Sequence, residues 1–430
     1  MIGSALGSGD DRTAALLAQG YEFTGRLRPG TGPVRLRLVG RPALLLTGPD
    51  GVRSFYGTPE LRRRRAVPLV VRWPLFGPGA IHGLDGDAHR WRRALFRRVL
   101  SDAGVRRLVD LADQEWALAI ADWESAGGGA VFDTAVDVYG RAVQRWAGLP
   151  FTSTVFAREL ARIVDGFAVP GRPWARAVLA RLRCQRWARH VIRHARHQLG
   201  RVPEESSPLQ AIATATAVDG YPLPLGTAAT ELLNVLRPTV AVAWLAAFGM
   251  LALQRNPLWW DRLAAEPDPA PGEPVGPVAR ACAHETRRWA PFVPLLAARA
   301  AADVRLPQGP VRRGERVLLD VHGTDYDPRH WPEPDRFDPG RFLPDDGAAR
   351  RDSFVAQGGG DPENGHRCPG EPATVDLLAH TLHRLSRLPV TLTPDQDLSV
   401  PLHRMPTRPV SGVLLQFRTD PDGHTAGRRS

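Results

Sequence analysis

The feature that most constrains the fold is a long apolar stretch at residues 229–254, which has the length and composition of a helix. A membrane span would be almost free of charged residues, but Glu231, Asn234 and the Arg237–Pro238 pair interrupt this stretch. A helix that is apolar on every side is buried by other elements. The stretch is therefore predicted to be the central helix of a soluble protein, and it contains one costly buried cation.

Helical patterns dominate the remaining sequence. From residue 91 to residue 253 apolar residues recur at helical spacing, and further helices are predicted at 278–289 and 371–385. Short strands are predicted at residues 34–39, 43–46 and 52–55, with a hairpin over 304–320 and a final strand at 413–418. The chain of 430 residues is thus predicted to be mainly α, with small peripheral β-sheets.

The cysteines and the N-terminal segment bear on the compartment. Only Cys184, Cys282 and Cys368 are present, too few and too scattered for a disulfide framework or a cysteine-based zinc site. Residues 1–20 contain no apolar segment typical of a signal peptide or an anchor. These observations favour the reducing interior of the cell, and we expect a cytoplasmic protein.

The formal charge of +11 comes entirely from arginine, because the sequence contains no lysine. The arginines are spread along the chain, with clusters at 62–65 and 186–196, and no nucleic-acid-binding motif accompanies them. We interpret the clusters as solvated helix faces, with an acidic electron-donor protein docking there as the alternative. Nucleic acid is not an expected partner.

A single cysteine, Cys368, lies in a glycine-rich loop that leads directly into the helix predicted at 371–385. Glycines allow backbone N–H groups to approach the sulfur, and the helix N-terminus favours a thiolate. Such a cysteine suits the axial ligand of a haem iron, where a thiolate favours O–O cleavage. An ordinary buried cysteine is the alternative.

Several motifs precede this loop in a consistent order. Glu285 and Arg288 are three residues apart on one helix face, and residues 322–328 read HGTDYDP. They are followed by Trp331, Pro334, Phe337, Pro339, Arg341 and Phe342. Together with the cysteine loop, these residues resemble the cytochrome P-450 superfamily, from about residue 35 to the C-terminus.

That resemblance implies a fold, a cofactor and two sets of residues. It implies the cytochrome P-450 fold in one catalytic domain spanning 1–430, with flexible ends at about 1–20 and 419–430. It also implies haem b, with Cys368 as the metal ligand, and a buried ionic cluster of Glu285, Arg288 and Arg341. Arg63, His89 and His366 match positions that can hold the haem propionates. His89 and Arg93 are four residues apart on a helix, so both are expected to point toward the same ligand edge; a surface ion pair is the alternative for each.

The central helix departs from the superfamily, whose typical members carry an acidic residue followed by threonine there. The Arg237–Pro238 pair instead resembles the fatty-acid peroxygenase branch, as do residues 75–86, residues 287–294 and the Gln-Gly-Gly-Gly-Asp start of the cysteine loop. This resemblance implies an enzyme that uses hydrogen peroxide to oxidise fatty acids at the alpha or beta carbon. The products would be hydroxy acids or, by oxidative decarboxylation, terminal alkenes.

Arg237 is the residue on which this interpretation depends. A guanidinium offers a planar fork to a carboxylate. The resemblance implies that Arg237, next to Pro238, holds the substrate carboxylate, which would replace the missing protein acid and shuttle a proton between the peroxide oxygens. The alternative is that Arg237 pairs with a protein carboxylate or reaches solvent. Phe76 and Phe292 are expected to be pocket walls or ordinary core residues.

His82 is the second expected catalytic residue. The resembling branch has histidine at this position in members noted for decarboxylation and often glutamine in those noted for hydroxylation. A histidine here could donate a proton and position the substrate. A loop histidine that faces away from the pocket is the alternative. Phe167, Pro170 and Gly171 are expected along the substrate channel, and Trp244 and Trp289 are candidates for narrowing it.

Two other functions stay open at this point. One is a monooxygenase of unknown substrate that depends on separate redox proteins, and the other is a non-catalytic haem sensor. A partner-dependent monooxygenase would show negligible turnover with peroxide alone. A haem sensor would form no product under any condition. The expected partners are a fatty acid or another carboxylic acid, with no redox partner, nucleic acid or membrane anchor.

Overall fold

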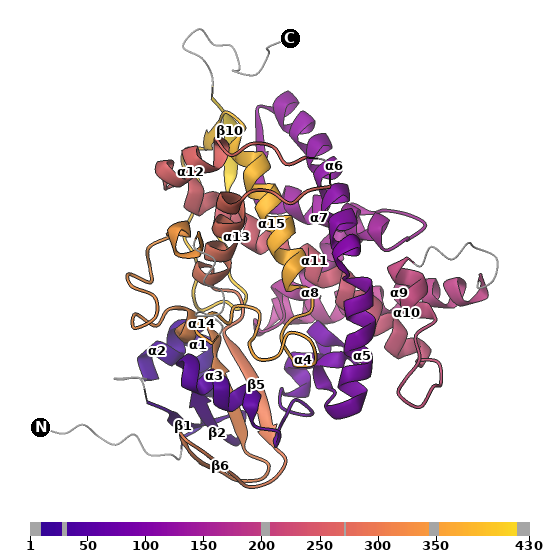
Figure 1. The fold of residues 1–430 in the computed structure, drawn as a ribbon, viewed down its shortest axis with the longest axis vertical. Helices are drawn as coiled ribbons and strands as arrows, with labels where there is room; N and C mark the ends of the chain where they lie inside the picture. The colour runs from indigo at the N-terminus through magenta and orange to yellow at the C-terminus, as the bar shows by residue number, and fades with distance from the viewer. Residues whose placement is uncertain (1–9, 28–31, 199–206, 271, 344–351, 419–430) are drawn as a thin grey trace, which may run out of the picture.

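The computed structural model of this chain describes residues 10–27, 32–198, 207–270, 272–343 and 352–418. Most of these residues are helical, and Figure 1 shows the helices forming the larger part of the molecule, with β1, β2 and β5 gathered at one end. The predicted flexible ends lie mostly outside the described residues. The described part of the N-terminal end, residues 10–20, includes the helix Thr13–Gln19.

The helices and strands have the following bounds. The α-helices are α1 (Thr13–Gln19), α2 (Glu22–Leu27), α3 (Gly48–Gly57), α4 (Leu69–Phe76), α5 (Gly86–Val99), α6 (Asp102–Ala126), α7 (Val131–Trp146), α8 (Thr154–Asp165), α9 (Arg172–His197), α10 (Pro208–Ala213), α11 (Leu225–Gln254), α12 (Pro257–Ala264), α13 (Pro277–Trp289), α14 (Val321–Asp325) and α15 (Glu371–Ser386), and the 3-10 helices are η1 (Ile81–Gly83) and η2 (Pro339–Phe342). The strands are β1 (Val34–Leu38), β2 (Arg41–Leu46), β3 (Leu61–Arg62), β4 (Gly128–Ala130), β5 (Leu295–Ala300), β6 (Val304–Leu306), β7 (Gly309–Val311), β8 (Arg316–Asp320), β9 (Val390–Leu392) and β10 (Leu414–Phe417).

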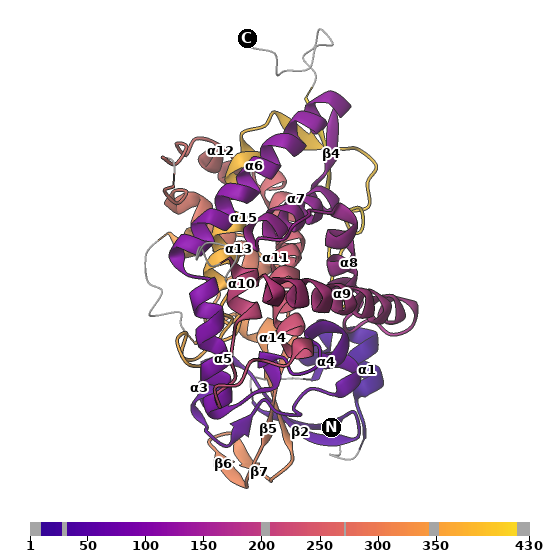
Figure 2. The ribbon, with the colours of Figure 1, turned by 90° about the vertical axis from the view of Figure 1, so that its right-hand side faces the viewer.

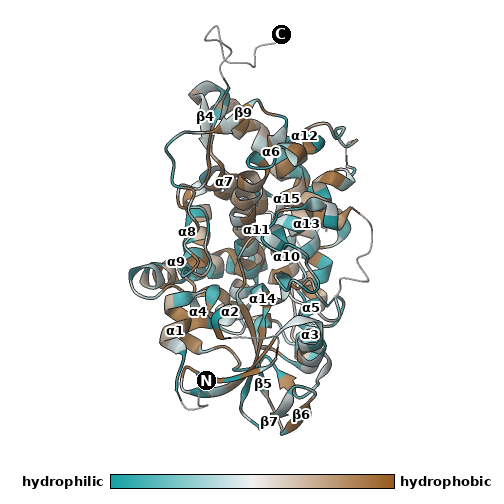
Figure 3. Cartoon of the chain, turned by 90° about the vertical axis from the view of Figure 1, so that its left-hand side faces the viewer, coloured by the Kyte–Doolittle hydropathy of each residue, from teal (hydrophilic) through white to brown (hydrophobic). Residues whose placement is uncertain are grey.

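The predicted central helix is α11. It is long and apolar enough to cross a membrane, yet 94% of its most apolar window is buried inside the protein. Helices α7, α8, α9 and α15 pack around it. Figure 3 shows the apolar colour concentrated on α7 and α11 in the middle of the molecule. The prediction of a buried core helix is confirmed, and whatever α11 presents to a ligand lies deep inside the fold.

The strands form three small sheets, and the largest of them lies at one end of the molecule. The largest has the order β1-β2-β8-β5-β3, in which β2 and β8 are parallel and the other neighbours are antiparallel. A second sheet has the order β4-β10-β9, and β6 pairs with β7 in a hairpin. Figure 2 shows β6 and β7 at the edge of the molecule, beyond β5. The hairpin predicted over 304–320 is therefore only β6–β7, because β8 joins the large sheet.

The strand predicted at residues 52–55 is wrong, because this segment lies in α3. Pro49 occupies the first turn of the helix, where its missing N–H costs nothing. Val52 and Phe55 are three residues apart, so both face the same side, and they pack against Leu44 and Leu46 of β2. A three-residue spacing of apolar side chains places them on one face of a helix that covers the sheet, whereas in a strand they would point to opposite faces.

Candidate functional site

Cys368 lies immediately before α15, as the sequence predicted. The residue is half-buried, and protein atoms surround its thiol. Its backbone N–H donates to the carbonyl of Gln357 at 3.0 Å. Burial raises the pKa of the Cys368 thiol, whereas the Gly370 N–H and the charges of Arg287 and Arg93 lower it.

Arg93 of α5 holds this loop in place. Its guanidinium donates to the carbonyls of Glu363 at 2.8 Å and Arg367 at 2.7 Å, and also to that of Pro362. A buried guanidinium that caps three loop carbonyls stabilises a segment with few backbone hydrogen bonds of its own. Arg93 therefore supports the cysteine loop, a role that the sequence did not predict.

Three of the predicted site residues come together next to the cysteine. The rings of His89 and His366 lie 3.9 Å apart, and Arg63 stacks on Phe55 at 4.1 Å. Burial lowers the pKa of His89 to about 4, and burial followed by the charge of Arg63 lowers that of His366. The Nη1 of Arg63 is buried without a hydrogen-bond partner.

This arrangement fits a haem. A porphyrin needs one axial ligand on the iron and basic partners for its propionates. Cys368 supplies the thiol on a half-buried residue, and the unpartnered Arg63 nitrogen with the adjacent histidine pair suits carboxylates. Within the described ranges, no cluster of three histidine, cysteine, aspartate or glutamate side chains is placed to hold a bare metal ion.

Arg237 extends from α11 and is only 6% exposed. Its one hydrogen bond joins Nη2 to Oδ1 of Asn234 at 3.5 Å, and its Nε is buried without a partner. Burial, and then the charge of Arg181, lowers its pKa to about 9, so the guanidinium is still charged at neutral pH. Among the residues that the structure describes, Arg237 has no carboxylate partner.

The acidic residue nearest to Arg237 along the helix, Glu231, is already occupied. It accepts hydrogen bonds from Arg92 at 2.5 Å, from the backbone N–H of Ile81 at 2.9 Å and from Asn234 at 3.0 Å. Asn234 in turn presents its oxygen to Arg237. In the described part of the chain, Arg237 therefore does not form the ion pair with a protein carboxylate that was the alternative to substrate binding.

Phe76 is the last residue of α4, and His82 lies in η1, between α4 and α5. Their rings stack with centroids 4.1 Å apart. His82 keeps exposed surface although many protein atoms surround its imidazole. Burial, followed by the charge of Arg237, lowers its pKa to about 3. The imidazole is therefore neutral at physiological pH and close enough to Arg237 to feel its charge.

The remaining predicted pocket residues differ in how deeply they are buried. Phe292 and Phe167 are partly buried and pack against the main core, and Pro238 is partly open on α11. Pro170 and Gly171 are exposed just before α9. Of the two tryptophans, Trp244 is completely buried edge-on to Phe132, whereas Trp289 is only partly buried and donates to the carbonyl of Asp335.

Arg181 of α9 is a buried cation that the sequence analysis missed. It is 0% exposed and donates to Gln185 at 2.8 Å and to the carbonyl of Phe76 at 3.4 Å. A side chain on Gly77 would collide with it, since an added Cβ would lie 1.8 Å from Nη2. The helical spacing of Ala177, Arg181 and Cys184 on the apolar face of α9 was the available signal.

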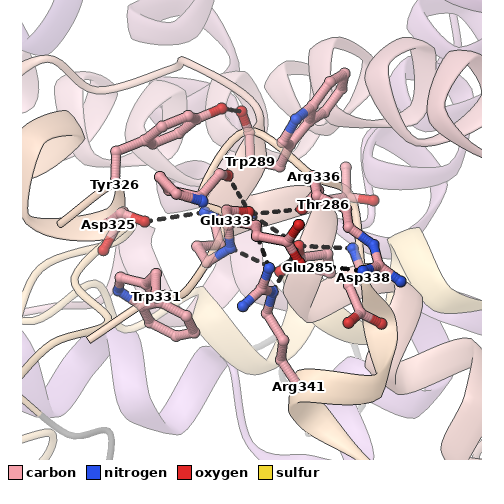
Figure 4. Close-up of polar contacts among 12 residues, drawn as sticks. Glu285, Thr286, Trp289, Asp325, Tyr326, Trp331, Glu333, Arg336, Asp338 and Arg341 are labelled. Carbon is pink, nitrogen blue, oxygen red and sulfur yellow. Dashed lines mark hydrogen bonds and ion pairs between the residues drawn. The ribbon is translucent and has the colours of Figure 1, made fainter. Parts of the chain in front are cut away.

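The predicted ionic cluster is confirmed and lies at the end of α13 (Figure 4). Arg288 donates to both oxygens of Glu285, at 2.7 Å from Nε and 2.8 Å from Nη2, and to the carbonyl of Asp325 at 3.0 Å. Nε of Arg341 lies 3.5 Å from Glu285, which also accepts the backbone N–H of Asp338 at 2.9 Å. This cluster joins α13 to the segments around α14 and η2.

Comparison with known proteins agrees with this geometry. The family described as cytochrome P-450 matches residues 276–416. Cytochrome P-450 4A11 of Homo sapiens is 30% identical over 149 residues, which cover 34% of this chain and 27% of that protein. Cytochrome P-450 132 of Mycobacterium tuberculosis is 40% identical over 80 residues, which cover 19% and 17% respectively. The chain thus matches only a minor part of the length of these relatives.

Solved structures match nearly the whole chain. Cytochrome P450SP alpha (CYP152B1) in complex with (R)-ibuprophen superposes with a TM-score of 0.87 and 33% identity, covering 95% of this chain and 98% of that one. Ligand-free cytochrome P-450 OleT superposes with a TM-score of 0.87 and 29% identity, covering 95% and 97%. The chain therefore belongs to the cytochrome P-450 family, in the branch that contains P450SP alpha and OleT.

Proposed function

We propose that this protein is a haem-thiolate peroxygenase that uses hydrogen peroxide to oxidise fatty acids at the alpha or beta carbon. Hydroxylation and oxidative decarboxylation to a terminal alkene are the two outcomes. The observation that carries the proposal is Arg237, a buried cation in the central helix with a single 3.5 Å hydrogen bond and an unpartnered Nε. A carboxylate would supply the missing partner.

The ligands of the similar structures support a carboxylic-acid substrate. One structure of P450SP alpha holds (R)-ibuprophen, and one of an OleT variant holds arachidonic acid. Both molecules carry a carboxylate, although their apolar parts differ in shape. The shared group is the one that Arg237 could bind, so the proposal extends to fatty acids and other carboxylic acids.

Bound haem would supply the peroxide-activating and oxygen-transferring chemistry; the Cys368 thiolate would hold its iron, and Arg63, His89 and His366 would bind its propionates. Arg237 would orient the substrate by its carboxylate. Because the central helix carries no free acid beside Arg237, the substrate carboxylate itself would accept and return a proton between the peroxide oxygens.

Anchoring at one end determines which carbon reacts. A carboxylate fixed on Arg237 keeps the alpha and beta carbons at a constant distance from the reactive centre, while Phe76 and Phe292 would guide the chain. His82, stacked on Phe76, would position the substrate as a neutral imidazole and influence the ratio of hydroxy acid to alkene. We further propose that the enzyme is cytoplasmic and works without a redox partner.

Product analysis tests the proposal directly. Purified ferric protein would be mixed with a medium- or long-chain fatty acid and hydrogen peroxide, without any redox protein. Hydroxy acid or terminal alkene is the expected product. If haem is intact and several acids give no product, the protein is instead a partner-dependent monooxygenase. If the acids also leave the iron spin state unchanged, a haem sensor becomes the better description.

A further inference from the structure

The side chain of Gln357 lies next to the cysteine sulfur. This residue begins the glycine-rich part of the loop, and its carbonyl already accepts the backbone N–H of Cys368 at 3.0 Å. Its side-chain Nε2 lies 3.8 Å from Sγ of Cys368, within reach of an N–H···S hydrogen bond. Gln357 therefore contacts Cys368 twice, once through its backbone and once through a group that mutation can change.

The orientation of the Gln357 amide follows from its neighbours. Arg287 can only donate hydrogen bonds, and its Nε lies 2.7 Å from Oε1 of Gln357, so the oxygen must face the arginine. The Thr374 hydroxyl donates to the carbonyl of Gly370 at 3.0 Å, and its oxygen accepts from Nε2 of Gln357 at 3.0 Å. One amide N–H is thus directed to Thr374 and the other to the sulfur.

Arg287 is itself held firmly. It is 3% exposed, and it donates to Glu371 at 2.5 Å and to Nδ1 of His284 at 2.9 Å. Its guanidinium also packs on the ring of Phe354 at 4.9 Å. Such fixed partners restrict the arginine to one position. A continuous chain of polar contacts therefore runs from Glu371 through Arg287 and Gln357 to the sulfur of Cys368.

We propose that Gln357 is a positioning residue that donates a hydrogen bond to the Cys368 thiolate and thereby limits how strongly the sulfur donates electrons to iron. The inference rests on the haem ligation given under the proposed function. A hydrogen bond to a ligating sulfur stabilises its negative charge and raises the reduction potential of the metal. Because Arg287 fixes the amide, the bond is set by the fold before haem binds.

The test measures the haem-loaded protein and does not depend on turnover. Gln357→Met keeps the approximate size but removes the donor, and Gln357→Glu keeps the contact with Arg287 but turns an acceptor toward the sulfur. Thr374→Val is the matched control, because it removes the other partner of the same amide and leaves the sulfur contact. The readouts are the ferric–ferrous reduction potential and the iron–sulfur stretching frequency.

We expect the reduction potential to fall from wild type to Gln357→Met and further to Gln357→Glu, with Thr374→Val close to wild type. A stretching frequency and potential unchanged in both Gln357 variants would overturn the proposal. If the methionine variant does not retain haem, Gln357→Asn offers the same comparison, because its shorter amide withdraws from the sulfur. A wild-type ferrous carbon monoxide complex without the thiolate band would instead overturn the haem ligation itself.

Discussion

Two buried arginines in this protein differ in what surrounds them. Arg288 is 1% exposed and Arg237 is 6% exposed, so both have lost almost all contact with water. Arg288 donates to both oxygens of Glu285 and to the carbonyl of Asp325, whereas Arg237 has one hydrogen bond of 3.5 Å. Burial alone would lower both pKa values, but Glu285 raises that of Arg288, and the pKa of Arg237 falls to about 9.

The difference separates a structural cation from one that awaits a ligand. A buried charge is costly unless hydrogen bonds and an opposite charge offset the loss of water. The Arg288 cluster meets this need inside the chain and joins α13 to the segments around α14 and η2. Arg237 lacks an opposite charge among the described residues, because Glu231 is already paired with Arg92. The same residue type thus stabilises the fold at one position and would bind an anion at the other.

The largest expected effect comes from breaking the paired site. Arg288→Ala removes the arginine that donates to both oxygens of the buried Glu285 and leaves only the more distant Arg341 beside it, so we expect a loss of about 3–5 kcal/mol in the free energy of unfolding. Denaturant unfolding followed by circular dichroism measures it. Arg336→Ala is the control, because its pair with Glu333 is exposed and should contribute no more than about 1 kcal/mol. Equal losses in both variants would contradict a structural role for the Arg288 cluster.

Breaking the unpaired site should affect activity instead. For Arg237→Ala we expect kcat/KM with a fatty acid and peroxide to fall roughly 30- to 5,000-fold, the equivalent of about 2–5 kcal/mol for one buried charge pair. Haem content and the ferrous carbon monoxide band should stay as in wild type. Arg237→Lys keeps a positive charge but lacks the planar fork of the guanidinium, so its kcat/KM should lie between those of the wild type and Arg237→Ala. Full activity of the alanine variant would remove Arg237 from the substrate site.

The sequence was sufficient for features whose signal is local. Apolar periodicity predicted α11 and α15, and the three-residue spacing of Glu285 and Arg288 placed them on one helix face. Residues 52–55 were misassigned because four residues do not contain enough periods to distinguish a helix on a sheet from a strand.

Partners that are far apart in the chain could not be predicted. Arg92 and Glu231 are 139 positions apart, and nothing in either segment indicates that they pair. Consequently the sequence left open whether Arg237 had a protein partner. The buried Arg181 was hidden in the same way, because α9 contains many arginines, and only the packing of α9 against α11 determines which of them leaves solvent.

The lack of a partner for Arg237 should also affect the stability of the substrate-free protein. If Arg237 is an unpaired buried cation, Arg237→Met should make the substrate-free protein more stable, by about 1–2 kcal/mol, because an apolar side chain needs no partner. This is the opposite sign to Arg288→Ala. The measurement is denaturant unfolding of protein from which fatty acids have been extracted. A destabilised methionine variant would show that Arg237 also supports the fold.

The smallest expected effect concerns His82, which responds to the charge of Arg237. Burial lowers its pKa from the ordinary 6.5 to about 3, so the folded protein keeps the imidazole neutral while the unfolded chain takes up a proton as the pH falls below 6.5. His82 therefore weakens the fold as the pH falls from 6.5 toward 3. It should not change charge between about pH 5 and about pH 8.

A neutral His82 makes a specific prediction about products. The ratio of alkene to hydroxy acid should stay constant from about pH 5 to about pH 8, because the imidazole does not titrate in that range. His82→Gln should lower the alkene share at every pH, since the amide stacks on Phe76 less well than a ring. Gas chromatography of the products measures both. The contrary outcome is a product ratio that changes near pH 6.5 in the wild type but not in His82→Gln. It would mean that the bound substrate carboxylate raises the pKa of His82 back to its ordinary value, against the effects of burial and Arg237.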